Sequence, residues 1–142
     1  IEVSIHPLPE DLFVNGRPVQ ISQVLLNLLN NAHDALRAGE ADDSRIEIFG
    51  WKKNDWIELH VVDNGPGIPD SVRDRIMQPF FTTKEVGKGT GLGLSISLSI
   101  MEDHKGELTL ESSMRPTRFI MRFPHADSAF APPIDELALK VA

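Results

Sequence analysis

The sequence contains no cysteine, and this absence excludes a disulfide framework and a thiolate metal site. Basic charge is also scarce, because 14 lysine and arginine residues stand against 21 aspartate and glutamate residues, which gives a net charge of −7. A strongly acidic chain without a basic run is not typical of a protein whose main partner is nucleic acid. A nucleotide ligand remains compatible with this charge, because a few local cations can dominate a small site.

Long apolar runs are missing too. No stretch approaches the roughly 20 apolar residues that a membrane-spanning helix requires, and the first residues lack the basic and apolar regions of a signal peptide. We therefore expect a cytoplasmic domain without a membrane segment of its own. The chain begins with Ile1 instead of methionine, so we expect it to be a piece of a longer protein, which could itself be anchored in a membrane. Its 142 residues suit one domain.

The most informative stretch is residues 80–97, where glycines at positions 87, 89, 91 and 93 precede an apolar segment. Glycine lets backbone N–H groups approach a ligand, and the start of a helix attracts phosphate. The spacing excludes a P-loop, because Lys88 is followed by Gly89, and a Rossmann turn, because the glycines alternate as G-x-G-x-G. A flexible surface loop is the alternative. Hydroxyl groups and cations that suit an anion lie in the same stretch: Thr82, Thr83, Lys84 and Lys88.

A helix is predicted over residues 18–38, because apolar residues recur there at i, i+3, i+4 and i+7. Its other face carries Asn27, Asn31 and Asp34 at i, i+4 and i+7, so these residues form one polar stripe. Asparagine and aspartate are mediocre helix formers, and their concentration here indicates a site. Amide and carboxylate oxygens are the hard ligands that Mg²⁺ prefers. A polar face with helix-to-loop hydrogen bonds is the alternative.

A carboxylate ends one of the predicted strands. Residues 45–51 and 56–63 alternate as the two strands of a hairpin, and Trp51 and Trp56 are expected to pair across it. The second strand delivers Asp63 into the glycine turn DNGPGIP. A buried, unpaired carboxylate would be costly, and a ligand donor such as the exocyclic amine of adenine would relieve that cost. An Asx turn is the alternative.

Shorter patterns predict the remaining elements. They indicate a strand at residues 1–5, a short helix from its N-cap Asp70 to about residue 77, and a helix over residues 91–105. Two further strands are expected, one at Leu108 and Leu110 and one at residues 118–123. The domain is then residues 1–124, and residues 125–142 are interpreted as a tail or short docking helix.

These stretches resemble the catalytic, ATP-binding domain of two-component sensor histidine kinases, in the GHKL superfamily with the Bergerat fold. QVLLNLLNNAHDA at residues 23–35 is similar to the N box, and DNGPGI at residues 63–68 to the first glycine box. PFFTTK at residues 79–84 is similar to the F box, and GKGTGLGL at residues 87–94 to the second glycine box. The motifs occur in family order, and the resemblance covers about residues 1–124.

The resemblance implies a two-layer α/β (α+β) sandwich, in which a mixed sheet packs on about three helices. ATP would lie between the helices under a mobile lid at about residues 77–90. Asp63 would accept the adenine amine, and Asn31 would be the main Mg²⁺ ligand with Asn27 in support. Asn27, Asn31 and Lys88 form the implied catalytic group, while Phe80 and its neighbour Phe81 would anchor the lid. The implied nucleotide-binding set is Asn31, Asp34, Asp63, Gly65, Gly67, Ile68, Phe80, Thr83, Lys84, Lys88, Gly89, Thr90, Gly91, Leu92 and Gly93.

The resemblance also implies a reaction: transfer of the γ-phosphoryl group of Mg-ATP to a histidine on a separate dimerisation domain, and then to a response regulator receiver domain. The hydrolytic branches of the superfamily carry a glutamate at the position of Asn27. Because an amide cannot act as a general base, the sequence favours transfer over hydrolysis. The alternatives are a nucleotide-binding regulatory or docking module without turnover, and an ATPase or serine kinase of the same superfamily.

None of the five histidines has the sequence context of a phosphoacceptor, and His6 is followed by Pro7-Leu8-Pro9, which excludes a long helix there. We therefore predict that this chain alone binds Mg-ATP but does not phosphorylate itself. Incubation with γ-labelled ATP should leave the chain unlabelled. Stable, acid-labile phosphate on the chain would contradict the prediction.

Overall fold

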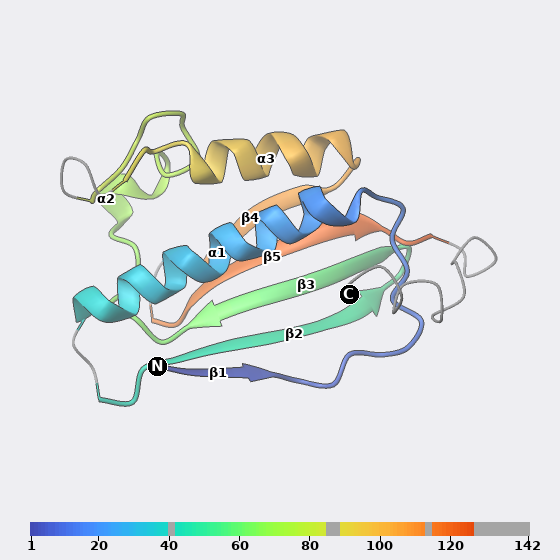
Figure 1. The fold of residues 1–142 in the computed structure, drawn as a ribbon, viewed down its shortest axis with the longest axis horizontal. Coiled ribbons are helices and arrows are strands. Elements are labelled where there is room, and N and C mark those ends of the chain that lie inside the picture. Colours follow the sequence, from blue (N-terminus) through green and yellow to red (C-terminus); the bar gives the residue numbers. More distant parts are fainter. Residues whose placement is uncertain (40–41, 85–88, 113–114, 127–142) are drawn as a thin grey trace.

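The structure is a computed structural model that describes residues 1–39, 42–84, 89–112 and 115–126 (Figure 1). Within these ranges, five strands form one mixed sheet in the order β1-β2-β3-β5-β4. β1 runs parallel to β2, and all the other neighbouring strands are antiparallel. The strands are β1 (Glu2–Ile5), β2 (Arg45–Lys53), β3 (Trp56–Asp63), β4 (Glu107–Ser112) and β5 (Thr117–Pro124).

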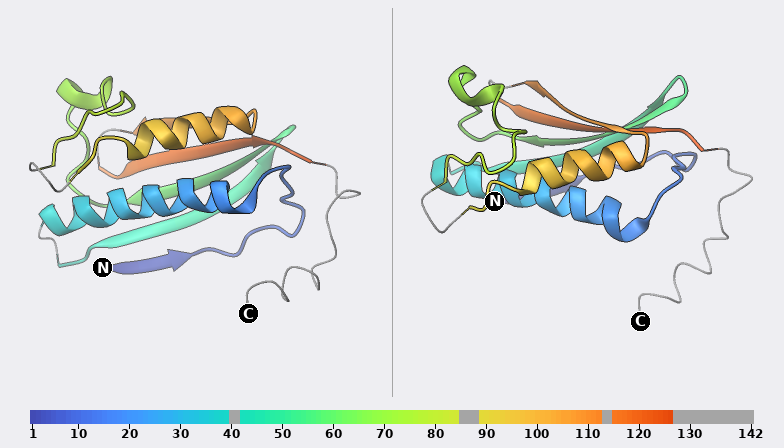
Figure 2. Two further views of the ribbon diagram at one scale, coloured as in Figure 1. Left: turned by 45° about the horizontal axis from the view of Figure 1, so that its top comes forward. Right: turned by 90° about the horizontal axis from the view of Figure 1, so that it is seen from above.

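Helices cover one face of this sheet. α1 (Pro18–Gly39) and α3 (Gly93–Asp103) lie side by side over the strands (Figure 2). The short α2 (Asp70–Arg73) lies beyond the N-terminal end of α3 (Figure 1). The expected two-layer α/β sandwich with a mixed sheet is therefore confirmed.

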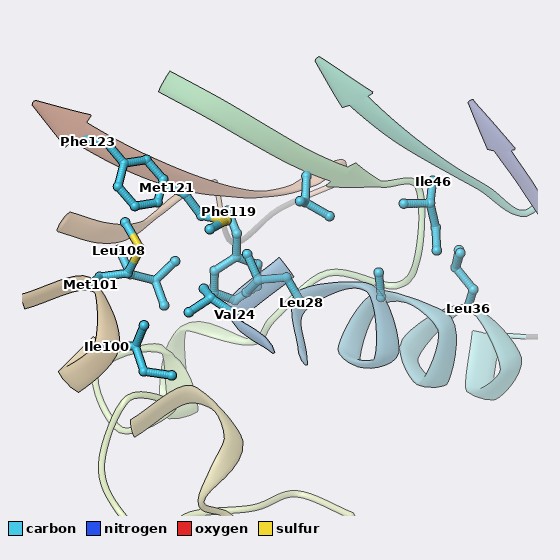
Figure 3. Close-up of a cluster of buried hydrophobic side chains, with 12 residues drawn as sticks. Val24, Leu28, Leu36, Ile46, Ile100, Met101, Leu108, Phe119, Met121 and Phe123 are labelled. Carbon is cyan, nitrogen blue, oxygen red and sulfur yellow. The ribbon is translucent and has the colours of Figure 1, made fainter. Parts of the chain in front are cut away.

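The core sits between α1, α3 and the sheet (Figure 3). α1 forms because its apolar residues follow the helical repeat, and Pro18 occupies the first turn, where a missing N–H costs nothing. One stripe of the helix faces the sheet and is buried: Val24, Leu28, Ala32 and Leu36. The partners of this stripe in the cluster are Ile46, Val61, Ile100, Met101, Leu108, Phe119, Met121 and Phe123.

β2 and β3 form the predicted hairpin, but its tryptophans do not pair. The register places Trp51 opposite Glu58, because the turn begins later than the sequence pattern indicates. Trp51 instead contacts His60, with 4.3 Å between the ring centroids. Since successive residues of a strand point to opposite faces, this contact lies on the face away from the helices. The expected pairing of Trp51 with Trp56 is therefore wrong.

Two helix starts differ from the prediction. Asp70 does not cap α2, because Pro69 is the N-cap and Asp70 already lies in the first turn, where a negative charge suits the helix dipole. The helix also ends at Arg73, earlier than expected. α3 begins at Gly93 instead of residue 91, because Gly91 has φ +66°, a left-handed conformation that does not fit a right-handed helix.

The chain stays attached to the domain for two residues beyond β5. The N–H of His125 donates to the carbonyl of Asp55, and the N–H of Ala126 donates to the carbonyl of Phe13, both at 2.8 Å. The tail or docking helix predicted for residues 125–142 otherwise lies outside the described residues. None of the helices in the described ranges combines the length and apolar character needed to span a lipid bilayer.

We predict that Leu28→Ala lowers the free energy of unfolding by about 2–5 kcal/mol, the cost of a cavity at a fully buried position. Leu28 is 1% exposed at the centre of the core. Urea denaturation followed by circular dichroism measures the change. Val19→Ala is the matched control, since Val19 is 81% exposed on the same helix, and should change stability by less than about 0.5 kcal/mol. Equal effects of the two substitutions would contradict the assigned core.

Candidate functional site

One flank of α1 carries Asn27, Asn31 and Asp34, and we call it the polar flank. It contacts the start of α3. The half-buried Asn27 donates from Nδ2 to Oγ of Ser97 at 2.9 Å. A Cβ atom at Gly93 would lie 2.3 Å from Oδ1 of Asn27, so a side chain at this position would displace the Asn27 amide. Asn27 therefore fixes the first turn of α3 against α1. Asn31, one turn further along α1, is also half-buried.

Asp63 ends β3 with its carboxylate buried at 4% exposure. Oδ1 accepts the backbone N–H of Gly65 at 2.9 Å, and the hydroxyl of Thr117 also donates to this carboxylate. Thr117 reaches it because the register of β3 with β5 places the two residues opposite each other. The position at the strand end is the one that the sequence predicts.

Burial raises the pKa of the Asp63 carboxyl group above its ordinary value. The hydrogen bonds from Gly65 and Thr117 act in the opposite direction but are the smaller effects. The ionised form is therefore under-solvated in this structure. Because a carboxylate has about four acceptor sites, it can accept further donors, and a ligand that brings an N–H group would suit it.

The glycine turn after β3 lies against the C-terminal half of α1. A Cβ atom at Gly65 would lie 3.7 Å from that of Ala35, which is one turn beyond Asn31 on this helix. Gly67 has φ +85°, a conformation that strains any residue with a side chain. The turn that follows Asp63 therefore lies about one helical turn from Asn31, although the two come from distant parts of the sequence.

The glycine-rich loop closes on itself before α3 begins. We call residues 80–84 and 89–91 the loop base. A Cβ atom at Gly89 would lie 2.7 Å from Oγ1 of Thr82, and one at Gly91 would lie 2.4 Å from the carbonyl carbon of Phe80. Phe80 and Gly91 are both left-handed, with φ of 65° and 66°. The two arms of the loop base therefore touch, and the contact at Gly91 requires glycine because the nearest atoms belong to the backbone of Phe80 and φ is positive.

An ion pair joins the loop base to α1. Nζ of Lys84 lies 2.5 Å from Oδ2 of Asp34. The hydrogen bond from Lys84 holds the pKa of the Asp34 carboxyl group below its ordinary value. The pair places the ammonium group beside the flank of α1 that carries Asn31, three residues before Asp34. This is the neighbourhood in which the sequence predicts an anion-binding lysine.

The start of α3 adds a second source of positive potential. The first N–H groups of a helix have no partner within the helix, and the helix dipole favours anions at this end. Gly93 opens α3 beside Asn27, and the N–H of Leu92 donates to Oγ1 of Thr90 at 3.3 Å. The N-terminal end of α3 and the ammonium group of Lys84 thus both lie against the polar flank of α1.

Some predicted residues do not join this group. Phe80 is 77% exposed in this structure, and its role in anchoring the lid stays a prediction. The neighbouring Phe81 is half-buried, with an arginine guanidinium group 4.5 Å from its ring centroid. Ile68 packs against the core cluster, and Lys88 lies outside the described residues. The exposed members of the predicted set also include Thr83 and Thr90.

The structure adds two residues that sequence analysis missed, Ser97 and Thr117. Both are buried polar residues, and each hydrogen bonds a predicted site residue, Asn27 and Asp63 respectively. The local signal is weak, because Ser97 is one of three serines in α3 and Thr117 is marked only as the first residue of β5. Finding them requires the pairing of α1 with α3 and of β3 with β5.

The side-chain oxygen atoms on the polar flank of α1 suit a metal ion that binds together with the phosphate groups of a substrate. Among the described residues, no group of three His, Cys, Asp or Glu side chains could form a metal site of its own. Mg²⁺, however, is commonly held by one or two protein oxygens together with substrate phosphates. The amide oxygen of Asn31 meets this requirement. A cavity of about 390 Å³ near His104 lies at the other end of α3 and is separate from this group.

Comparison with known proteins gives a consistent set of similarities. A family model described as "Histidine kinase-, DNA gyrase B-, and HSP90-like ATPase" matches residues 16–127. The two-component sensor PprA of Pseudomonas aeruginosa is 42% identical over 134 residues, which cover 92% of this chain and 14% of PprA. Sporulation kinase A of Bacillus subtilis is 36% identical over 116 residues, covering 81% of this chain and 18% of that kinase. This chain thus spans less than a fifth of the length of either relative.

Solved structures are similar over most of the chain. The catalytic domain of histidine kinase ThkA has a TM-score of 0.71 and 35% sequence identity, covering 87% of this chain and 77% of that domain. The mycobacterial sensor histidine kinase MprB has a TM-score of 0.65 and 26% identity, covering 87% of this chain and 79% of that one.

The environment of Asp63 predicts an unusual pH dependence of stability. A carboxyl group whose pKa is raised by folding stabilises the protein while it is protonated, and this contribution is lost as the pH rises through the folded-state pKa. Asp63→Asn should therefore make the ligand-free protein at pH 7 at least as stable as the wild type. Urea denaturation should show this advantage shrinking as the pH falls towards 4.

Thr117→Val is the matched control for this prediction. It removes the hydroxyl group that favours the ionised carboxylate, so it should lower stability at pH 7. A clear loss of stability in Asp63→Asn at pH 7, with no pH dependence of the difference, would contradict the assigned environment.

Proposed function

Because the chain belongs to the histidine kinase-, DNA gyrase B- and HSP90-like ATPase family and is the ATP-binding catalytic domain of a sensor histidine kinase, we propose that it transfers the γ-phosphoryl group of Mg-ATP to a histidine on a separate dimerisation domain. One observation carries this proposal. The Lys84 side of the loop base and the start of α3 contact the polar flank of α1, and the turn after Asp63 lies beside Ala35 and Leu36 of the same helix.

Asp63 is the group that we assign to adenine. Its carboxylate is buried and has two donors, so the exocyclic amine of adenine would supply a third and relieve the burial cost. Gly65 and Gly67 keep the adjoining turn free of side chains, which lets a flat ring approach the backbone. The apolar Ile68, packed on the core, follows this turn.

The triphosphate belongs, in this proposal, between α1 and the loop base. Lys84 supplies a cation, and Gly89 to Gly93 supply backbone N–H groups and a helix start. Asn31, with Asn27 one turn earlier in support, would hold Mg²⁺. When bound, Mg²⁺ neutralises charge on the phosphate oxygens and orients the transferred group. The sequence also assigns Lys88 to the phosphates.

Asn27 favours transfer over hydrolysis. Its amide cannot abstract a proton from water, and its Nδ2 is already bonded to Ser97. Catalysis then consists of holding the phosphates and Mg²⁺ in place until an acceptor arrives. We infer that the acceptor is a histidine of the dimerisation domain, that a response regulator receives the phosphoryl group next, and that this domain works in the cytoplasm, where ATP is available.

The test supplies the missing acceptor. The chain is mixed with γ-labelled ATP, Mg²⁺ and the separately prepared phosphoacceptor domain of its parent protein. We expect acid-labile label on the acceptor histidine, none on this chain, and no label when Mg²⁺ is removed by chelation. Failure to label the acceptor at saturating Mg-ATP would refute the transfer reaction.

Asp63→Asn serves as the binding-defective variant in the same assay. Loss of one charge-assisted hydrogen bond is worth about 1.5–3 kcal/mol, so calorimetry should show ATP affinity lowered by about tenfold to a hundredfold. Labelling should fall at low ATP and recover partly at high ATP. Equal ATP affinity in the wild type and the variant would mean that the adenine position is misassigned.

A further inference from the structure

We propose that Asp34 is a positioning residue, which holds the loop base against α1 through its ion pair with Lys84. This inference rests on the proposed function and gives Asp34 a different role from direct nucleotide binding. It follows from the contacts that surround Lys84, since the ion pair itself is partly exposed and such pairs are individually weak.

The Asp34 carboxylate is engaged through both of its oxygens. Oδ2 accepts a hydrogen bond from Nζ of Lys84, and Oδ1 lies 3.5 Å from Nδ1 of His33 on the same helix. The side chains of Asp34 and Lys84 are 48% and 35% exposed. The pair therefore sits at the surface of the polar flank, one turn beyond Asn31.

The stem of Lys84 connects this ion pair to both arms of the loop base. A Cβ atom at Gly89 would lie 3.1 Å from Cβ and from Cδ of Lys84, so the stem runs directly along Gly89. The backbone N–H of Lys84 donates to Oγ1 of Thr82 at 3.1 Å. Fixing the ammonium group of Lys84 therefore fixes the segment before the loop and the segment after it.

A second attachment lies on the other side of Asn31. Asn27 bonds Ser97 and contacts Gly93, so the end of the loop is held to α1 there. Asn27, Asn31 and Asp34 are spaced i, i+4 and i+7 along one helix. The loop base and the start of α3 are thus attached to α1 on the two sides of Asn31. Asp34 supplies the attachment through a charge and Asn27 through a hydrogen bond.

The test measures the loop base without nucleotide, so that it does not depend on phosphate binding. Amide hydrogen exchange is followed by NMR at Lys84, Gly89 and Leu92 in the full chain. Asp34→Asn and Lys84→Met should each accelerate exchange about twofold to fivefold, the range expected from the strength of an exposed ion pair. The double variant should exchange no faster than the single variants, because both remove the same contact.

Two further variants separate positioning from a general effect of charge. Lys84→Arg should keep slow exchange, since it preserves both the ion pair with Asp34 and a long aliphatic stem along Gly89. Glu111→Gln is the matched control, because Glu111 pairs with Arg118 at 2.9 Å with 52% and 35% exposure on the other face of the sheet. This control should leave exchange in the loop base unchanged.

Unchanged exchange in Asp34→Asn and Lys84→Met would overturn the proposal and leave a passive surface pair. A fall in Mg-ATP affinity of equal size for Asp34→Asn in the wild-type and Lys84→Met backgrounds, with unchanged exchange, would instead make Asp34 a direct ligand. Either result leaves the phosphoryl-transfer reaction untouched. Conversely, a wild-type chain that fails to bind Mg-ATP refutes the proposed function whatever the exchange rates are.

Discussion

Burial of one stripe of α1 fixes the rotation of this helix, and the whole candidate site depends on that rotation. Val24, Leu28, Ala32 and Leu36 turn towards the sheet and exclude water from the core. Because an α-helix has 3.6 residues per turn, the polar flank is then held at a set angle towards α3 and the loop base. The apolar stripe thus positions residues that it does not contain, and a substitution that shifted α1 would move every group in the site together.

Several features of the candidate site lower the free energy of unfolding of the domain. Burial around Asp63 disfavours the ionised form of its carboxyl group and raises the pKa of that group. Gly67 and Gly91 lie in left-handed conformations, and glycine at such positions loses more chain entropy on folding than other residues do. Each feature is unfavourable for an empty protein and useful for a protein that binds a flat ring and phosphates. The large core between α1, α3 and the sheet offsets these costs.

Local patterns in the sequence carry most of the fold. The apolar repeat of residues 18–38 predicts α1 almost to its ends, and the alternating residues before Asp63 predict β3 and its terminal carboxylate. The resemblance to sensor kinases supplies the arrangement of these elements, which no local pattern contains. The start of α3 is missed because the sequence does not reveal that Gly91 is left-handed.

What the sequence could not give depends on contacts between distant residues. Asp34 and Lys84 are 50 positions apart, and their pairing follows from how the loop base folds back on α1. Thr117 meets Asp63 only because β5 enters the sheet beside β3. Trp51 is misassigned for a simpler reason, since a small change in the turn of a hairpin alters every cross-strand partner. The sequence therefore shows which functional residue types are present, and the structure shows which of these residues are neighbours.

The meeting of Phe80 with Gly91 has a consequence for how such a domain can vary. The backbone at Phe80 touches Gly91, so the residues between them form a closed loop. This closing contact does not depend on the length of the loop. The entropy of closing a ring rises only with the logarithm of its length, by about 0.6 kcal/mol for each doubling. Residues can therefore be inserted or removed between Lys84 and Gly89 at little thermodynamic cost.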